Sequence, residues 1–232
     1  MSTTASDRTG EHGVTHVDTP GLGPAPAPAS AAPSAPLADP AYRLYRLSVE
    51  QYQAFGRSGI LTPDDRVELI EGLVVEKMTR YERHIGTTKR LARFIERALP
   101  AGWHVGKEDP IVLARSEPEP DISVLRGDID SYDQQKPQAA DVNLVVEVAD
   151  SSYAFDRRKM AIYAEAGIPT YWIANLNADR IEVYSEPTGP DPTPEYRSRR
   201  DFARSAAIPL VIDGREVARL AVDTLLAPVQ PR

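Results

Sequence analysis

The chain has no cysteine, which excludes disulfide bridges and thiolate metal ligands. Any metal would have to be held by oxygen atoms or by histidine. The chain also lacks a run of about 20 apolar residues, the length that a helix needs to cross a bilayer. Residues 1–40 have neither the basic start nor the continuous apolar stretch of a secretory signal. We therefore expect a soluble, cytoplasmic protein.

Residues 1–40 contain seven prolines and few bulky apolar residues. Such a segment buries too little surface to offset the entropy lost on ordering. We expect it to be a disordered Pro/Ala-rich tail, and residues 41–232 to form a single domain with its own core.

The formal net charge of −7 argues against a protein that coats nucleic acid nonspecifically, because such proteins are usually basic. A nuclease remains compatible with this charge, since catalytic carboxylates add negative charge and binding can rely on one local basic patch.

The first half of this domain shows three helix or hairpin patterns. Ser48 is expected to cap a helix that runs to about Phe55, with Gln51 as its capping-box partner. Residues 66–78 predict a hairpin that turns at Glu71-Gly72. Residues 81–99 predict an amphipathic helix. Its apolar face consists of Ile85, Thr88, Leu91, Ala92, Ile95 and Leu99.

Short strands are expected over the ranges 103–105, 110–114, 122–125, 144–148, 170–174 and 180–184. A loop is expected over 127–141, and a helix capped by Asp156 that runs to about Ala166 and stops at Gly167. Residues 196–226 indicate two or three more strands and a short helix. This order of elements predicts an α/β or α+β sheet with helices packed against it.

Two carboxylates have unusual positions in this pattern. Asp121 follows Pro120 and opens a strand, and Glu147 lies near the end of the apolar run Leu144-Val-Val-Glu-Val. A carboxylate in a buried strand is costly unless it is paired or binds a metal. Glu147 can equally emerge where the strand leaves the core, and the sequence leaves both interpretations open.

Lys159 falls on the same helical stripe as Ile162, Tyr163 and Ala166, while Arg157 and Arg158 point elsewhere. A lysine on a packing face usually extends outward to water. Here it can instead reach back to the carboxylates of the preceding strand. Two carboxylates can hold Mg²⁺, which polarises a phosphate and lowers the pKa of a bound water, and a lysine can orient that water or offset charge on the phosphate.

The motifs also resemble a known family. They are Val67-Glu-Leu-Ile-Glu-Gly, His84, Pro120-Asp121, Val145-Val-Glu-Val-Ala-Asp-Ser-Ser, Asp156-Arg-Arg-Lys, and Gly167-Ile-Pro-Thr-Tyr-Trp-Ile. Together, over roughly residues 45–225, they resemble the Uma2 family of restriction endonuclease-like proteins, also called DUF820. The resemblance implies the PD-(D/E)XK nuclease superfamily and a restriction-endonuclease-like mixed sheet flanked by helices, with an additional N-terminal hairpin and C-terminal strands.

On this resemblance, the metal ligands are Asp121 and Glu147. The superfamily lysine would stand two residues after Glu147, where this chain has Ala149, so Lys159 is expected to replace it. Glu68 also matches a family position and is expected as a further catalytic and metal carboxylate, or else as a solvent-facing strand residue. His84 is expected at the site or in a structural role, and Tyr163 in packing.

A local basic patch lies between Lys77 and Arg97. This segment contains seven Lys or Arg residues and two Glu. Its arginines on the outer face of the helix are Arg83, Arg90, Arg93 and Arg97. They can contact phosphates, although a charged outer face is also usual for an amphipathic helix.

We therefore expect an endonuclease that uses Mg²⁺ or Mn²⁺ to hydrolyse DNA, and on family grounds a homodimer. Two alternatives stay open: an inactive module of the same fold that binds nucleic acid or protein, and a metal-dependent hydrolase of another phosphate ester.

Overall fold

A computed structural model of the protein describes residue 1 and residues 43–229. The expected disordered tail over residues 1–40 lies almost wholly outside the described residues, and the domain division stays a prediction. From Leu44 onwards the chain forms one compact unit. None of the helices in the described part of the chain is long and apolar enough to cross a membrane.

The α-helices are α1 (Val49–Arg57), α2 (Glu82–Ala98), α3 (Tyr153–Glu165) and α4 (Val222–Leu225), and three short 3₁₀ helices are η1 (Pro63–Asp65), η2 (Ile129–Tyr132) and η3 (Ala139–Asp141). The strands are β1 (Val67–Ile70), β2 (Leu73–Glu76), β3 (Trp103–Gly106), β4 (Ile122–Arg126), β5 (Val142–Ala149), β6 (Thr170–Asn175), β7 (Arg180–Pro187), β8 (Tyr196–Ala203), β9 (Ala207–Ile212) and β10 (Arg215–Ala221).

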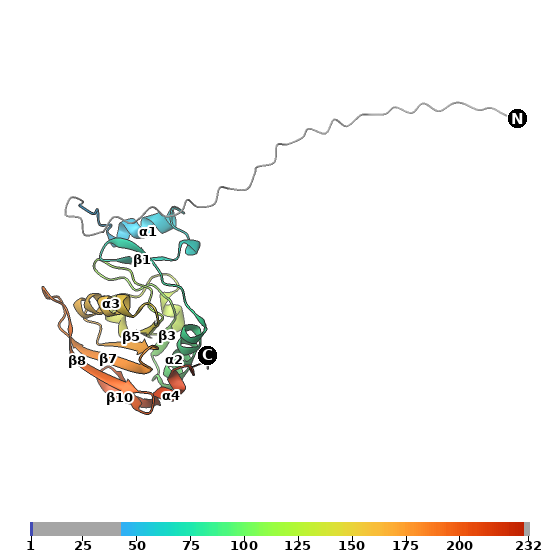
Figure 1. Ribbon diagram of the computed structural model, residues 1–232. Coiled ribbons are helices and arrows are strands. Elements are labelled where there is room, and N and C mark those ends of the chain that lie inside the picture. Colours follow the sequence, from blue (N-terminus) through green and yellow to red (C-terminus); the bar gives the residue numbers. More distant parts are fainter. Residues whose placement is uncertain (2–42, 230–232) are drawn as a thin grey trace. The chain divides into compact units, whose positions relative to one another are not determined.

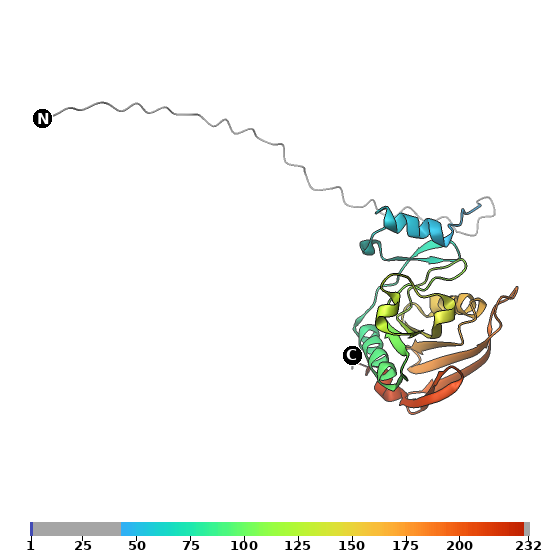
Figure 2. The same ribbon diagram turned by 180° about the vertical axis from the view of Figure 1, so that it is seen from behind.

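The central sheet has six strands in the order β3-β4-β5-β6-β7-β8. Only β5 and β6 are parallel, joined through α3, and the other neighbours are antiparallel. Helix α3 lies on one face of this sheet, and the β9–β10 hairpin with α4 lies on the other (Figure 1). Seen from behind, α2 lies beside β10 and α4 (Figure 2). The predicted mixed sheet flanked by helices, with an additional N-terminal hairpin and C-terminal strands, is confirmed.

Strand β5 separates two hydrophobic clusters, because its side chains alternate between the faces of the sheet. Leu144, Val146 and Val148 pack toward α2 and the β9–β10 hairpin. Val145 and Ala149 pack toward α3. Glu147 shares their parity, so it faces α3. All eight residues of β5 are buried, which explains the nearly continuous apolar run in its sequence.

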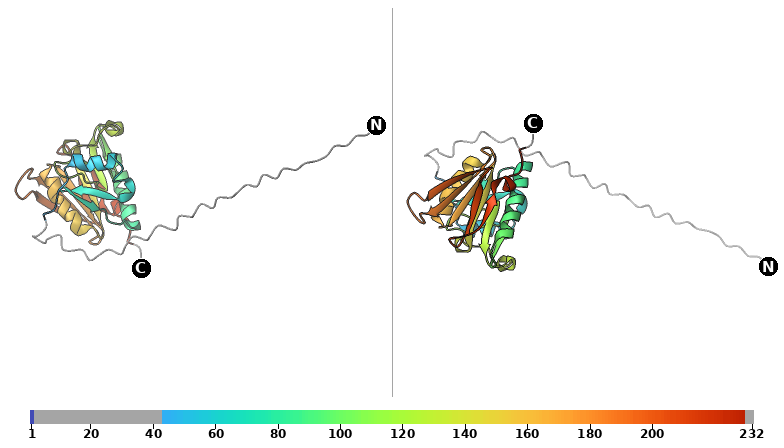
Figure 3. Two further views of the ribbon diagram at one scale, coloured as in Figure 1. Left: turned by 90° about the horizontal axis from the view of Figure 1, so that it is seen from above. Right: turned by 90° about the horizontal axis from the view of Figure 1, so that it is seen from below.

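The N-terminal hairpin follows local rules that the sequence already contains. The capping box between Ser48 and Gln51 begins α1 as predicted. Glu71 and Gly72 both have positive φ, as a two-residue hairpin turn requires. A Cβ at Gly72 would lie 2.7 Å from the Cβ of Arg46, so this position has no room for a side chain. Seen from above, α1 and the hairpin lie between α3 and α2 (Figure 3).

Three local predictions are wrong. Residues 110–114 form no strand, only an isolated bridge from Val112 to Gln138, because Pro110 lacks an N–H and the chain turns back at Leu113. Asp156 does not cap α3; the helix begins one turn earlier, after Ser152. Ile85 is 42% exposed rather than part of the buried face.

The buried face of α2 is rotated toward His84 and Thr87 because both side chains have polar partners inside the fold. The Nε2 atom of His84 contacts Asp121, and the Thr87 hydroxyl accepts a hydrogen bond of 3.0 Å from the Ala227 N–H. Apolar periodicity alone does not detect such partners.

Candidate active site

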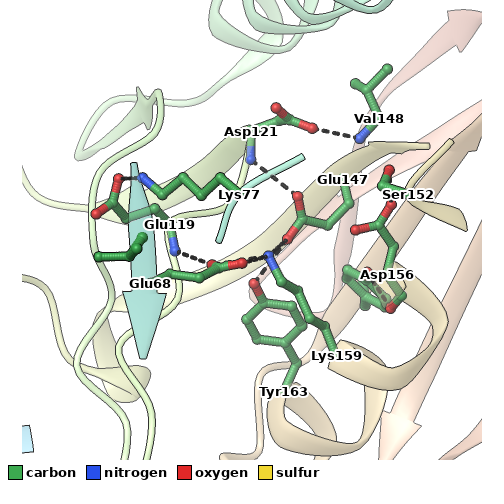
Figure 4. A network of polar contacts seen from close by, with 12 residues as sticks. Glu68, Lys77, Glu119, Asp121, Glu147, Val148, Ser152, Asp156, Lys159 and Tyr163 are labelled. Carbon is green, nitrogen blue, oxygen red and sulfur yellow. Dashed lines mark hydrogen bonds and ion pairs between the residues drawn. The ribbon is translucent and has the colours of Figure 1, made fainter. Parts of the chain in front are cut away.

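Four elements bring the predicted catalytic residues to one pocket at the end of the sheet. Glu68 comes from β1, Asp121 from the residue before β4, Glu147 from β5 and Lys159 from α3 (Figure 4). All four side chains are buried, between 2% and 8% exposed. They line a cavity of about 60 Å³, which His84 also lines.

Lys159 bridges two carboxylates. Its Nζ lies 2.8 Å from Glu68 Oε1 and 3.1 Å from Glu147 Oε1. The sheet-facing stripe of α3 explains this geometry, because Ile162 and Tyr163 on the same stripe are also buried, whereas Arg158 is exposed. The lysine therefore reaches back to the sheet rather than outward to solvent.

Glu68 is held from two sides, by the Lys159 ammonium and by the Glu119 N–H, which donates to its Oε2 at 3.0 Å. Glu119 in turn pairs with Lys77, so the hairpin and the segment before β4 are linked. Glu68 is thus no solvent-facing strand residue. Its contacts place it beside the lysine as a partner of that cation.

Hydrogen bonds from backbone N–H groups hold the carboxylates of Asp121 and Glu147 next to each other. The Val148 N–H donates to Asp121 Oδ2 at 2.8 Å, and the Asp121 N–H donates to Glu147 Oε2 at 3.3 Å. Pairing of Ile122 with Val146 sets this arrangement, since it places Asp121 opposite Glu147. The two carboxylates are therefore adjacent because of the β4–β5 register.

His84 also contacts Asp121, with 3.1 Å between Nε2 and Oδ2. Its Nδ1 atom is buried and has no hydrogen-bond partner among the described residues. Through this contact the first turn of α2 supports the aspartate, and such support orients carboxylates in metal sites.

Tyr163 was predicted to pack, but its hydroxyl donates a hydrogen bond of 3.1 Å to Glu147 Oε1. That oxygen also contacts Lys159. The spacing of four residues between Lys159 and Tyr163 was the available signal, because it places both on one side of α3. Sequence alone could not show that the hydroxyl reaches the carboxylate.

Asp156 is a further buried carboxylate that lines the cavity. It accepts a hydrogen bond of 2.6 Å from the Ser152 hydroxyl. Burial raises the pKa of Asp156 to about 6, while the Ser152 hydrogen bond and the Lys159 charge act in the opposite direction. The sequence assigned this residue to helix capping and so missed its place at the site.

Burial raises the pKa of Glu147 to about 8, against the lowering effect of Lys159. Burial lowers the pKa of Lys159, but the Glu147 and Glu68 carboxylates raise it by more, so it ends above its ordinary value. The ammonium of Lys159 therefore stays charged at neutral pH.

The charges of the cavity favour a cation. Seven Asp or Glu and three Lys or Arg line it.

Within the described residues, no group of three or more His, Asp or Glu is arranged to hold a metal ion. Asp121 and Glu147 are adjacent oxygen donors, and Asp121 Oδ1 accepts no hydrogen bond from the residues that the structure describes. Hard oxygen donors of this kind are those that Mg²⁺ and Mn²⁺ prefer.

The arginines of the predicted basic patch have different surroundings. Arg83 donates to the Leu176 carbonyl at 2.5 Å and to Asp179 Oδ1 at 2.6 Å, and Arg90 donates to the Thr224 carbonyl at 3.3 Å. Arg93 and Arg97 are exposed, and neither forms an ion pair within the described residues. A phosphate role for Arg83 would compete with its contacts to the C-terminal part of the fold.

Comparison with known proteins gives the family. The model of the Uma2 family, described as "Putative restriction endonuclease", matches residues 49–221. No curated protein matches the chain. A similar solved structure is the crystal structure of a "putative nuclease belonging to DUF820" from Anabaena variabilis ATCC 29413. The two are 14% identical with a TM-score of 0.60, over 77% of this chain and 97% of that one. The fold is thus shared with that protein, and the chain belongs to the Uma2 family.

Proposed function

We propose that the protein is an endonuclease that uses Mg²⁺ or Mn²⁺ to hydrolyse DNA phosphodiester bonds. One observation carries the proposal: Asp121, Glu147 and the Lys159 amine come together in one cavity whose lining has an excess of carboxylates. Membership of a family of restriction endonuclease-like proteins is consistent with it.

In this proposal Asp121 and Glu147 hold the cation. When bound, the cation polarises the phosphate and lowers the pKa of a water ligand. Lys159 places a fixed positive charge beside the phosphate, in a buried site where it stabilises developing negative charge more than it would in bulk water. Glu68 holds the lysine in place, and His84 and Tyr163 act as positioning residues for Asp121 and Glu147.

The test is cleavage of plasmid, linear and single-stranded DNA by the purified protein with Mg²⁺ or Mn²⁺. Asp121→Ala and Glu147→Gln should abolish cleavage, and Asp64→Asn should leave it unchanged because Asp64 is exposed and does not line the cavity. If the wild type cut no more than Asp121→Ala, the proposal would be wrong.

A second reading has a specific observation in its favour. Lys159 already bridges Glu68 and Glu147, so the lysine itself offsets negative charge that a metal ion would otherwise offset. An inactive binding module would retain this cluster without binding a cation. Titration with Mn²⁺ separates the two, because a metal site should show binding that Glu147→Gln removes.

A panel of small phosphate esters tests the remaining alternative, a hydrolase with another phosphate substrate. The homodimer and the cytoplasmic location stay predictions, and cross-linking and fractionation address them.

A further inference from the structure

A groove of about 870 Å³ opens beside the candidate active site, between α2, the edge strand β3 and the loop that follows β4. Arg80, His84 and Glu108 line both this groove and the active-site cavity. The two spaces are therefore neighbours that share these three residues as a common wall. A chain lying in the groove would arrive next to Asp121, which His84 contacts.

The groove has three exposed cationic side chains. Lys89, Arg93 and Lys107 line it, are exposed, and form no ion pair within the described residues. Among its carboxylates, Glu108 pairs with Arg80, and Glu96 accepts a hydrogen bond of 2.7 Å from the Val105 N–H. Asp128 is the third carboxylate. Beyond the Arg80–Glu108 pair, the groove thus has three cations against the two carboxylates of Glu96 and Asp128, a small positive excess in an acidic protein.

Flat and apolar groups lie between these charges. Trp103 and His104 are half-buried in the groove wall, and Ile85 and Ile129 are 42% and 72% exposed. The Arg126 guanidinium lies 4.4 Å from the Trp103 ring centre, and the His104 ring lies against Tyr132 with 5.7 Å between centres. These contacts orient both rings. Aromatic platforms between cations are the recurring design of grooves that bind single-stranded nucleic acid.

A second groove, of about 1160 Å³, lies between α1, η1 and the loop at residues 132–138. It is lined by as many carboxylates as Lys or Arg residues, and three of its cations are paired: Lys77 with Glu119, Arg80 with Glu108, and Lys136 with Glu117. Most of its cations are therefore already paired within the protein. The groove beside α2 is better suited to a polyanion.

We propose that the groove beside α2 binds an unpaired DNA strand adjoining the phosphate to be cut, with Lys89, Arg93 and Lys107 at its phosphates and a base against Trp103. Its volume is in the range of small-ligand pockets, roughly 300 to 1,000 Å³, which suits a few nucleotides rather than the broad interface of a duplex. The proposal rests on the proposed nuclease function for its substrate class.

The test measures binding of a labelled single-stranded oligonucleotide by fluorescence anisotropy in EDTA, where no hydrolysis occurs. The triple variant Lys89→Ala, Arg93→Ala, Lys107→Ala should weaken binding at least about tenfold and reduce the salt slope by about 0.7 for each lost phosphate contact. The matched control is Arg158→Ala, Arg197→Ala, Arg215→Ala, which removes equal charge from exposed positions outside the groove and should bind like the wild type.

Tryptophan fluorescence gives a second readout. The chain has two tryptophans, and Trp172 is fully buried, so quenching by the oligonucleotide should report on Trp103 and disappear in Trp103→Phe. Equal losses in the two triple variants would overturn the proposal. So would duplex DNA binding as tightly as the single strand without quenching.

Failure of this proposal and failure of the nuclease function are distinguishable. Groove-dependent binding without cleavage in Mn²⁺ would refute hydrolysis and keep the groove. Cleavage that the groove variant performs at the wild-type rate and affinity would refute the groove and keep hydrolysis.

Discussion

The Tyr163 hydroxyl lies 3.1 Å from Glu147 Oε1 and donates a hydrogen bond to it. Both side chains are buried, so water cannot replace this bond. Tyr163→Phe keeps the ring and removes only the donor. We expect the free energy of unfolding to fall by about 1 to 3 kcal/mol, because a buried hydrogen bond is lost and Glu147 Oε1 has one donor fewer. Urea denaturation measures this, and an unchanged midpoint would show that the hydroxyl does not support Glu147.

Removing the Lys159 cation should destabilise the fold more than Tyr163→Phe does. Lys159→Met keeps an unbranched side chain one atom shorter and leaves Glu68 and Glu147 without their shared partner. We expect the free energy of unfolding to fall by about 3 to 5 kcal/mol, the usual effect of removing one partner of a buried ion pair.

The matched control for that variant is Arg158→Met, one residue earlier in α3 and exposed. We expect it to stay within about 0.5 kcal/mol of the wild type. Adding Glu68→Gln to Lys159→Met should recover part of the lost stability, and equal effects of the Lys159 and Arg158 variants would contradict the buried cluster.

Arg83 provides a test of the basic-patch hypothesis. It bonds the Leu176 carbonyl and Asp179, and Arg204 bonds Asp179 as well. Arg83→Ala should therefore lower the free energy of unfolding by about 1 to 3 kcal/mol, because the bonds of a charged donor are lost. Arg97→Ala, on the exposed side of the same helix, should have little effect. A purely DNA-binding role for Arg83 would show the opposite, with unchanged stability and weaker oligonucleotide binding.

Stability should depend on pH through Glu182, whose side chain is fully buried in β7. Burial raises the pKa of Glu182, but hydrogen bonds from Tyr184 and Asn175 and the charge of Arg199 lower it by more, so the pKa is below its ordinary 4.5. A lowered pKa in the folded state means that the ionised group stabilises the fold above the unfolded-state pKa, and that this contribution is lost as the pH falls.

Glu182→Gln should therefore destabilise the protein by about 1 to 3 kcal/mol at neutral pH, and the difference should shrink below about pH 4.5. Thermal unfolding from pH 7 to pH 3 measures it. Glu186→Gln, at an exposed position of the same strand, should run parallel to the wild type. A difference that grew as the pH fell would reverse the assigned sign.

The sequence by itself determined the features that depend on neighbours in the chain. The capping box of Ser48 and Gln51, the turn at Glu71-Gly72 and the buried strand around Glu147 follow from local rules of hydrogen bonding, backbone conformation and burial. The sheet-facing direction of Lys159 also followed, because helical periodicity fixes which side chains share a face.

Only the tertiary structure decided which charges meet. The register of β4 against β5 places Asp121 beside Glu147, and the position of the hairpin brings Glu68 to Lys159, residues that are 91 positions apart. The same long-range packing engages Arg83 with the C-terminal segment and leaves Arg93 exposed in the groove. No periodic pattern encodes such contacts, because they depend on the positions of several elements at once.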